Sequence, residues 1–137
     1  MSKQYAAQFA APARPHSTPT PKRTPRAQPR HVPGAMNKTE AAFAQVLEAR
    51  LKAGEIVDYR FESLTLKLGA DCRYTPDFVV VNADYEIELY DVKGGFTRDD
   101  SAVKMRVCAY NWPFPLYIVT GKREKSGYVW TQKMVGK

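Results

Sequence analysis

The sequence predicts a mixed α/β domain of the α+β class, in which helices flank a central sheet, over residues 36–137. Three observations predict it: apolar residues recur at helical spacing in two segments, polar and apolar residues alternate in others, and turns rich in Gly, Asn or Asp separate them. The predicted element order is α-β-β-β-α-β, with a further strand near the C-terminus. A hairpin-rich first half followed by a helical crossover implies a mixed sheet with a helix on each face.

The first helix is predicted to begin after Asn37 and to end near Ala53. Asn37 and Glu40 have the spacing of a capping box, in which each residue hydrogen-bonds to the backbone of the other. Apolar side chains follow at helical spacing, and Gly54 is a typical stop signal.

Three strands are predicted next, over residues 56–68, 73–81 and 85–93. They alternate polar and apolar residues over most of their length, and turn residues separate them. Pro76 lies inside the second strand, where it cannot donate a hydrogen bond to a neighbour. We therefore expect an edge, a bulge or a bend at that point.

A second helix is predicted from a cap at Thr97 to about Tyr110. It provides the helical crossover of the mixed sheet. The apolar segment 116–120 predicts a short buried strand, and residues 127–132 predict an edge strand.

Residues 1–35 have a different composition from the rest of the chain. They contain seven of the ten prolines and six basic residues, but no Asp or Glu. Few large apolar side chains accompany them, so burial cannot offset the entropy cost of ordering the chain. We predict a disordered, basic, Pro-rich arm, which accounts for most of the formal net charge of +7. A polyanionic partner would suit such an arm, although charge alone identifies none.

Several functional classes are excluded by residues that the predicted domain lacks. His16 and His31 both lie in the arm, so a catalytic Ser-His pair, a His-metal site and an HNH-type nuclease are excluded. Cys72 and Cys108 lack the spacing of a metal site and are expected to be buried thiols in a reducing compartment. No apolar run approaches the ~20 residues of a membrane span, so no membrane partner is expected.

Three acids and a lysine are the candidate chemical groups: Glu40, Asp77, Asp91 and Lys93. Asp91 and Lys93 are two apart in a predicted strand and therefore share a face with Leu89, toward an apolar layer. Charges there are costly unless they are paired or lie at a cleft. Taken singly, each group has an ordinary explanation. Asp77 fits a turn, Asp91 and Lys93 fit a salt bridge at the sheet rim, and Glu40 fits the capping box.

Taken together, the four groups favour a metal site. If the second and third strands are neighbours, Asp77 and Asp91 lie close, and with Glu40 they surround Lys93 at a net charge of −2. Two carboxylates ~5 Å apart at an effective dielectric of ~20 repel by roughly 3 kcal/mol. A hard divalent cation such as Mg²⁺ would relieve that repulsion, and carboxylate-bound Mg²⁺ usually acts on a phosphate.

Pro76-Asp77 followed by Asp91-Val92-Lys93 resembles the signature of the PD-(D/E)XK nuclease superfamily. The element order resembles the restriction-endonuclease-like core of that superfamily. With Glu40 and the flanking segments, the chain looks like a phage-encoded group of endonuclease I-like or Holliday-junction-resolvase-like proteins. The resemblance covers about residues 36–120.

This resemblance implies a Mg²⁺-dependent endodeoxyribonuclease that hydrolyses DNA phosphodiester bonds, with Mn²⁺ as a substitute metal. Asp77, Asp91 and the backbone carbonyl of Val92 would hold the metal. Lys93 would orient or deprotonate the attacking water, and Glu40 would be a further acid, toward a second metal. Asp91 stands where Glu is commoner, so the metal would sit nearer the strand.

The resemblance also bears on partners and location. Branched DNA, such as a Holliday junction, is one candidate substrate, and a homodimer is one candidate assembly. A phage protein of this kind would act in the cytoplasm of a bacterial host. Residues near the acids in the sequence or along the second helix could contact DNA, namely Lys38, Arg73, Arg98, Lys104 and Arg106.

Two other functions stay open from the sequence. One is a nucleic-acid-binding module of the same fold without catalysis. The other is a protein-interaction domain recruited through the Pro-rich arm. For Lys104, an ion pair with Asp100 four residues earlier on the helix is the simpler explanation.

Overall fold

The computed structural model describes residues 34–94 and 99–136, so residues 1–33 of the predicted arm, Thr97 and Arg98 lie outside the described residues. The helices and strands, in chain order, are α2 (Lys38–Lys52), β1 (Ile56–Phe61), β2 (Leu66–Gly69), β3 (Cys72–Tyr74), β4 (Phe78–Asn82), β5 (Ile87–Lys93), α3 (Asp99–Asn111), β6 (Leu116–Glu124) and β7 (Gly127–Met134). The α+β class is confirmed.

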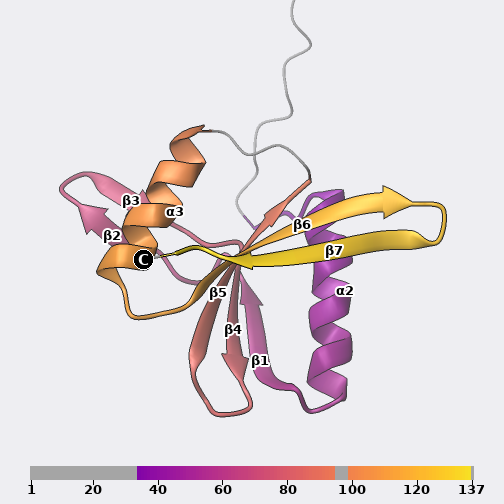
Figure 1. Ribbon diagram of the computed structural model, residues 1–137. Coiled ribbons are helices and arrows are strands. Elements are labelled where there is room, and N and C mark those ends of the chain that lie inside the picture. Colours follow the sequence, from indigo (N-terminus) through magenta and orange to yellow (C-terminus); the bar gives the residue numbers. More distant parts are fainter. Residues whose placement is uncertain (1–33, 95–98, 137) are drawn as a thin grey trace, which may run out of the picture. The chain divides into compact units, whose positions relative to one another are not determined.

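A mixed five-stranded sheet has the order β1-β4-β5-β6-β7, and β2 and β3 form a separate two-stranded sheet. Neighbouring strands of the large sheet are antiparallel except for β5 and β6, which are parallel across the α3 crossover. In Figure 1, α2 lies on one side of the sheet, and α3 lies on the other beside β2 and β3. A helix on each face was predicted and is confirmed.

The core has two parts because both faces of the sheet are covered. Side chains alternate along β5, so Tyr90 and Val92 pack with Phe43 of α2, whereas Leu89 packs with Met105 of α3. Tyr90 and Leu89 are almost fully buried. The middle of β5 is therefore apolar on both sides, and the charged residues at its end stand out.

The first helix confirms its predicted ends. The side chain of Asn37 accepts a hydrogen bond from the Glu40 N–H, and Glu40 returns one to the Asn37 N–H, as in a complete capping box. The helix ends before Ala53, and Gly54 adopts a positive φ of 76° that other residues rarely adopt.

The prediction of one long strand over residues 56–68 is wrong. The strand stops at Phe61, because Glu62 turns the chain with a φ of 47° and its N–H is bonded to the Asp77 carbonyl. The residues beyond form β2, which pairs with β3 instead of continuing the large sheet.

The predicted second strand, 73–81, is also two strands, and the bend expected at Pro76 is the break between them. Pro76 is fully buried and has no N–H to offer a ladder. The third strand begins at Ile87 rather than at residue 85, since Tyr85 closes the preceding turn with a φ of 61°. The last two strands are longer than predicted.

The remaining expectations concern thiols and membranes. Cys72 and Cys108 are both free, and Cys108 is buried as predicted, whereas Cys72 is only partly buried. Within residues 34–94 and 99–136, no helix has the length and apolar character needed to cross a membrane.

Candidate functional site

The start of β4 and the end of β5 bring two acids together. In the antiparallel pairing of these strands, Phe78 lies opposite Tyr90. The next position along the ladder places Asp77, just before β4, beside Asp91. The closeness that the sequence predicted for the two aspartates is therefore a consequence of strand register.

Asp77 is fixed by one hydrogen bond from β5 and one from the turn that follows β1. Its Oδ2 accepts a 2.7 Å hydrogen bond from the Val92 N–H, and its backbone carbonyl accepts a 2.9 Å bond from the Glu62 N–H. No hydrogen bond from the described residues reaches its other carboxylate oxygen. One oxygen thus anchors the side chain, and the other is left for a further partner.

The surroundings of Asp77 raise its pKa to about 7. Burial is the main cause, and the negative charge of Asp91 is the second. The Val92 N–H opposes the rise, Glu40 adds to it, and Lys93 opposes it. The carboxyl is therefore only partly ionised near neutral pH unless a cation joins it.

Asp91 is buried, with 4% of its surface exposed, although it is charged. Its Oδ2 accepts a 2.6 Å hydrogen bond from the Tyr74 hydroxyl. Its Oδ1 is buried and accepts no hydrogen bond from any residue that the structure describes. The Lys93 ammonium lies 2.8 Å from Oδ1 and forms an ion pair, but without the alignment of a hydrogen bond. We regard the contact as electrostatic, so Oδ1 keeps unused acceptor capacity in a place where that is costly.

Tyr74 is a site residue that the sequence analysis missed. Burial and the charge of Asp91 raise the pKa of its phenol well above the ordinary value, so the hydroxyl remains a donor. Tyr74 lies 17 residues before Asp91 and on the separate β2–β3 hairpin. No local sequence pattern predicts such a contact.

Lys93 is held between the sheet and α3. Its Nζ is 2.8 Å from Asp91 Oδ1 and donates a 3.0 Å hydrogen bond to the Ser101 hydroxyl. Its side chain is 19% exposed, compared with 6% for Asp91. The ammonium therefore has a fixed direction and retains some access to solvent. The sequence did not identify Ser101.

Glu40 is buried, with 5% of its surface exposed, at the first turn of α2. Its Oε2 accepts the capping hydrogen bond from the Asn37 N–H at 2.9 Å. It is also near enough to raise the pKa of Asp77. Glu40 therefore has two effects: it caps α2, and its negative charge adds to that of the acidic pair.

The donor set suits a hard cation only in part. In the portion of the chain that the structure describes, no three His, Cys, Asp or Glu side chains converge closely enough to hold a metal ion. Mg²⁺, however, keeps several waters and commonly binds through one or two carboxylates. The unbonded buried oxygen of Asp91 beside Asp77 fits that smaller set, to which the Val92 carbonyl could add.

The basic residues predicted to contact DNA are dispersed. Lys38 is exposed at the start of α2, two residues before Glu40. Arg73 is exposed on β3, on the opposite face from the inward-pointing Tyr74. Lys104 lies one turn along α3 from Ser101.

The other two predicted DNA-binding residues are Arg106 and Arg98. Arg106 borders a cavity between α3 and the end of β7, together with Lys133. Arg98 lies outside the described residues. Among the residues that the structure describes, Arg106 makes no hydrogen bond or ion pair with the aspartate pair, and Lys104 is the described cation nearest in sequence to Ser101, the partner of Lys93.

Comparisons of this chain with protein-family models, with curated proteins and with solved structures find no match. The candidate site is therefore defined by the geometry of its own residues.

Proposed function

We propose that this protein is a Mg²⁺-dependent endodeoxyribonuclease. The observation that carries the proposal is the pair of the buried Asp91 and the partly buried Asp77 beside Lys93, in which Asp91 Oδ1 accepts no hydrogen bond from the described residues. An acidic pair of this kind, at the start of one strand and the end of its antiparallel neighbour, fits metal-assisted phosphodiester hydrolysis.

A structural salt bridge explains this arrangement only incompletely. One ammonium can balance one carboxylate, whereas Asp77 is close enough to both Asp91 and Glu40 for their charges to raise its pKa. Burying that excess negative charge destabilises the fold unless a proton or a cation compensates it. A cation bound at this site would compensate the excess negative charge.

The arrangement of the elements also supports the proposal. The order α2-β1-β4-β5-α3-β6, with β5 and β6 parallel, fits the restriction-endonuclease-like core that the motif implies. The β2–β3 hairpin is then an insertion between the first two core strands, and β7 an addition at the edge. Asp77 lies just before the second of these strands, and Asp91 and Lys93 lie at the end of the third, which supports the proposal.

Each residue has a role that its contacts suggest. Asp77, Asp91 and the Val92 carbonyl would hold the metal, which when bound would polarise the phosphate and lower the pKa of water. Tyr74 and the Val92 N–H fix the two carboxylates in place before any ligand arrives. Lys93, aimed by Ser101, would orient the water and balance charge on the phosphate.

The reaction is an in-line displacement at phosphorus. The water oxygen bonds to phosphorus while the bond to the 3′ oxygen breaks, which leaves a 5′-phosphate and a 3′-hydroxyl. We propose branched DNA as the first substrate to test for this activity. We also propose that the protein is phage-encoded and acts in the cytoplasm of the bacterial host.

The test is cleavage of linear, nicked and four-way-junction DNA with Mg²⁺. The wild type is expected to cut at least one substrate, and Asp77→Asn and Lys93→Met should each slow cutting by about 100-fold or more. Asp84→Asn and Lys52→Gln change the same residue types on the exposed surface and should cut normally. A wild type inactive on every substrate, or full activity in both site variants, would rule out the proposal.

A second candidate function is nucleic-acid binding without catalysis. It is favoured by the finding that no three metal-ligand side chains converge among the described residues. Under this alternative the protein binds DNA equally well in EDTA and in Mg²⁺, and Mg²⁺ produces no heat in calorimetry. Heat that disappears in Asp77→Asn would instead support the nuclease.

A further inference from the structure

The hairpin formed by β6 and β7 extends past the candidate site. The last pair that β5 makes with β6 joins Lys93 to Thr120, at the end of β5. Strand β6 continues to Glu124, and among the described strands it pairs over that length with β7 alone. We call residues 121–130 the β6–β7 hairpin. Figure 1 shows its turn lying out beyond α2.

The tip of the β6–β7 hairpin is basic. Lys122, Arg123 and Lys125 are exposed and surround a single acid, Glu124, so residues 122–125 carry a net charge of +2. Within the described chain, none of the three cations forms a salt bridge. Their charge is therefore available to a partner. These three residues are not among the DNA-binding residues that the sequence predicted.

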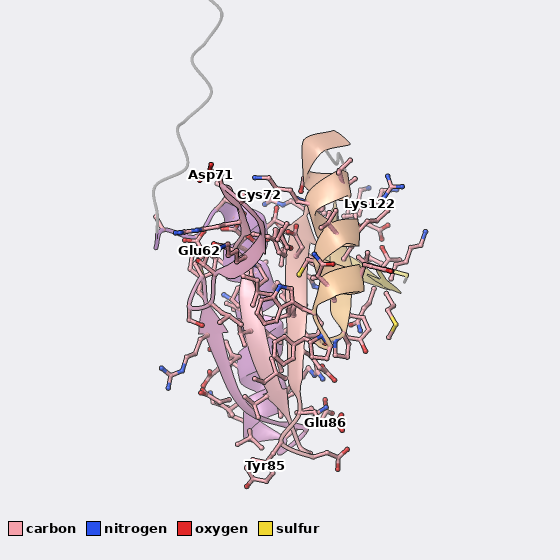
Figure 2. The ribbon with its side chains drawn as sticks, turned by 90° about the vertical axis from the view of Figure 1, so that its left-hand side faces the viewer. Glu62, Asp71, Cys72, Tyr85, Glu86 and Lys122 are labelled. Carbon is pink, nitrogen blue, oxygen red and sulfur yellow. The ribbon has the colours of Figure 1, made fainter. Side chains whose placement is uncertain are left out.

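Lys122 faces the same side of the sheet as the candidate site. Thr120 is paired with Lys93 in the parallel register, and residues two apart on a strand share a face. Lys122 therefore continues the face of Lys93, about 7 Å farther along β6. In Figure 2, Lys122 lies at the same end of the molecule as Glu62, which bonds to Asp77, and opposite to Tyr85.

The hairpin is held in place by aromatic packing. Trp130 lies opposite Gly121, and a Cβ on Gly121 would come within 2.5 Å of its ring. The Trp130 ring also contacts Phe43 of α2 at 5.3 Å and stacks on Tyr128 at 5.2 Å between centroids. This packing ties the base of the hairpin to α2, so its cations are presented by an ordered element.

We propose that the β6–β7 hairpin binds the phosphate backbone of the DNA duplex beside the scissile bond, through Lys122, Arg123 and Lys125. The inference rests on the proposed function and adds the surface that holds the substrate. Unpaired cations on an ordered element complement a polyanion, and a two-stranded ribbon is of a size that a DNA groove admits. Contacts to phosphate make this binding independent of sequence.

The test measures binding of the full chain to a short fluorescent DNA duplex in EDTA, where cleavage does not occur. Lys122→Gln/Lys125→Gln removes two cations from the hairpin. We expect it to lower affinity at low salt by about tenfold or more, and to reduce the slope of log K against log salt by about 2.

Two further variants control for charge and for folding. Lys52→Gln/Lys67→Gln removes two exposed lysines on α2 and β2 and should keep the wild-type slope. Lys122→Arg/Lys125→Arg keeps the charge and should restore affinity. An unchanged slope in the hairpin variant, an equal loss in the control, or no rescue by arginine would each overturn the inference.

The outcome is separable from that of the proposed function. If the wild type binds DNA through the hairpin but does not cut it with Mg²⁺, the hairpin assignment stands and the nuclease fails. If the wild type cuts DNA while the hairpin variant binds and cuts normally, the nuclease stands and the hairpin assignment fails. A wild type that does not bind the duplex at ~50 mM salt overturns the hairpin assignment.

Discussion

The hydroxyl of Tyr74 donates a 2.6 Å hydrogen bond to Asp91, which joins the separate β2–β3 hairpin to the end of β5. The hairpin thus does more than cover α3, because it satisfies one oxygen of a buried carboxylate. The other oxygen, Oδ1, is left to Lys93 and to any cation that binds.

Tyr74→Phe is expected to destabilise the protein by about 1–3 kcal/mol, because a buried carboxylate oxygen loses its hydrogen-bond donor. The effect is measured by urea unfolding at neutral pH. Tyr110→Phe, on an exposed side chain, is the matched control and should be neutral. Equal stability of the two variants would contradict the importance of the Tyr74–Asp91 bond.

Asp77 is expected to make the metal-free protein less stable as pH rises. Its pKa in the folded protein is raised from 3.8 to about 7, mainly by burial. The folded state therefore binds the proton more tightly, and this contribution is complete below about pH 4 and lost as the pH rises through about 7. In EDTA, between about pH 5 and pH 8, wild type should lose about 2–3 kcal/mol more unfolding free energy than Asp77→Asn.

Asp84→Asn removes a carboxylate from an exposed turn and is the control for this comparison. It should follow the wild-type pH dependence. A pH dependence in Asp77→Asn that matches wild type would show that Asp77 titrates as an ordinary acid.

Mg²⁺ is expected to bind more tightly at higher pH, since it must displace the proton from Asp77. Calorimetry at about pH 6 and pH 8 should show an increase in affinity of up to about tenfold, reflecting the pKa of about 7. Asp77→Asn should show no binding heat at either pH. Affinity that does not change with pH would argue against Asp77 as a ligand.

Lys93→Met leaves Asp91 as a buried carboxylate without its cation, and should destabilise the protein by about 3–5 kcal/mol. Lys93→Met/Asp91→Asn removes both charges and should recover most of that stability. If the ion pair is also the active site, the double variant stays folded and does not cut DNA. A stable double variant that cuts normally would reduce the pair to a structural salt bridge.

Gly121→Ala should displace the Trp130 ring, because its Cβ would lie 2.5 Å from the ring. Crowding of this kind typically costs about 1–3 kcal/mol, measurable by urea unfolding. Gly69→Ala is the control, since nothing lies within 4 Å of its added Cβ. If the two variants are equally stable, Trp130 does not hold the hairpin as inferred.

Local signals in the sequence predicted the local structure well. The capping box of Asn37 and Glu40 is confirmed because its partners are three residues apart and its hydrogen bonds are local. The alternation of residues 87–93 correctly predicted a strand with Asp91 and Leu89 on one face. The fold class followed from the same patterns.

The features that the sequence could not predict depend on distant pairing. Polar and apolar residues go on alternating past Phe61, so nothing local marks the turn at Glu62 that separates β1 from β2. The Tyr74–Asp91 bond requires the β2–β3 hairpin to fold over α3, which no spacing encodes. The basic β6–β7 hairpin was missed because its place beside the site follows from the length of β6 beyond β5.

Gly34, the first residue that the structure describes, is linked to the candidate site through one intermediate residue. Its N–H donates a 2.9 Å hydrogen bond to the Glu62 side chain, and the Glu62 N–H donates one to the Asp77 carbonyl. Glu62 therefore joins the start of the described chain to the backbone of the candidate catalytic acid, so these two segments, distant in the sequence, restrain each other.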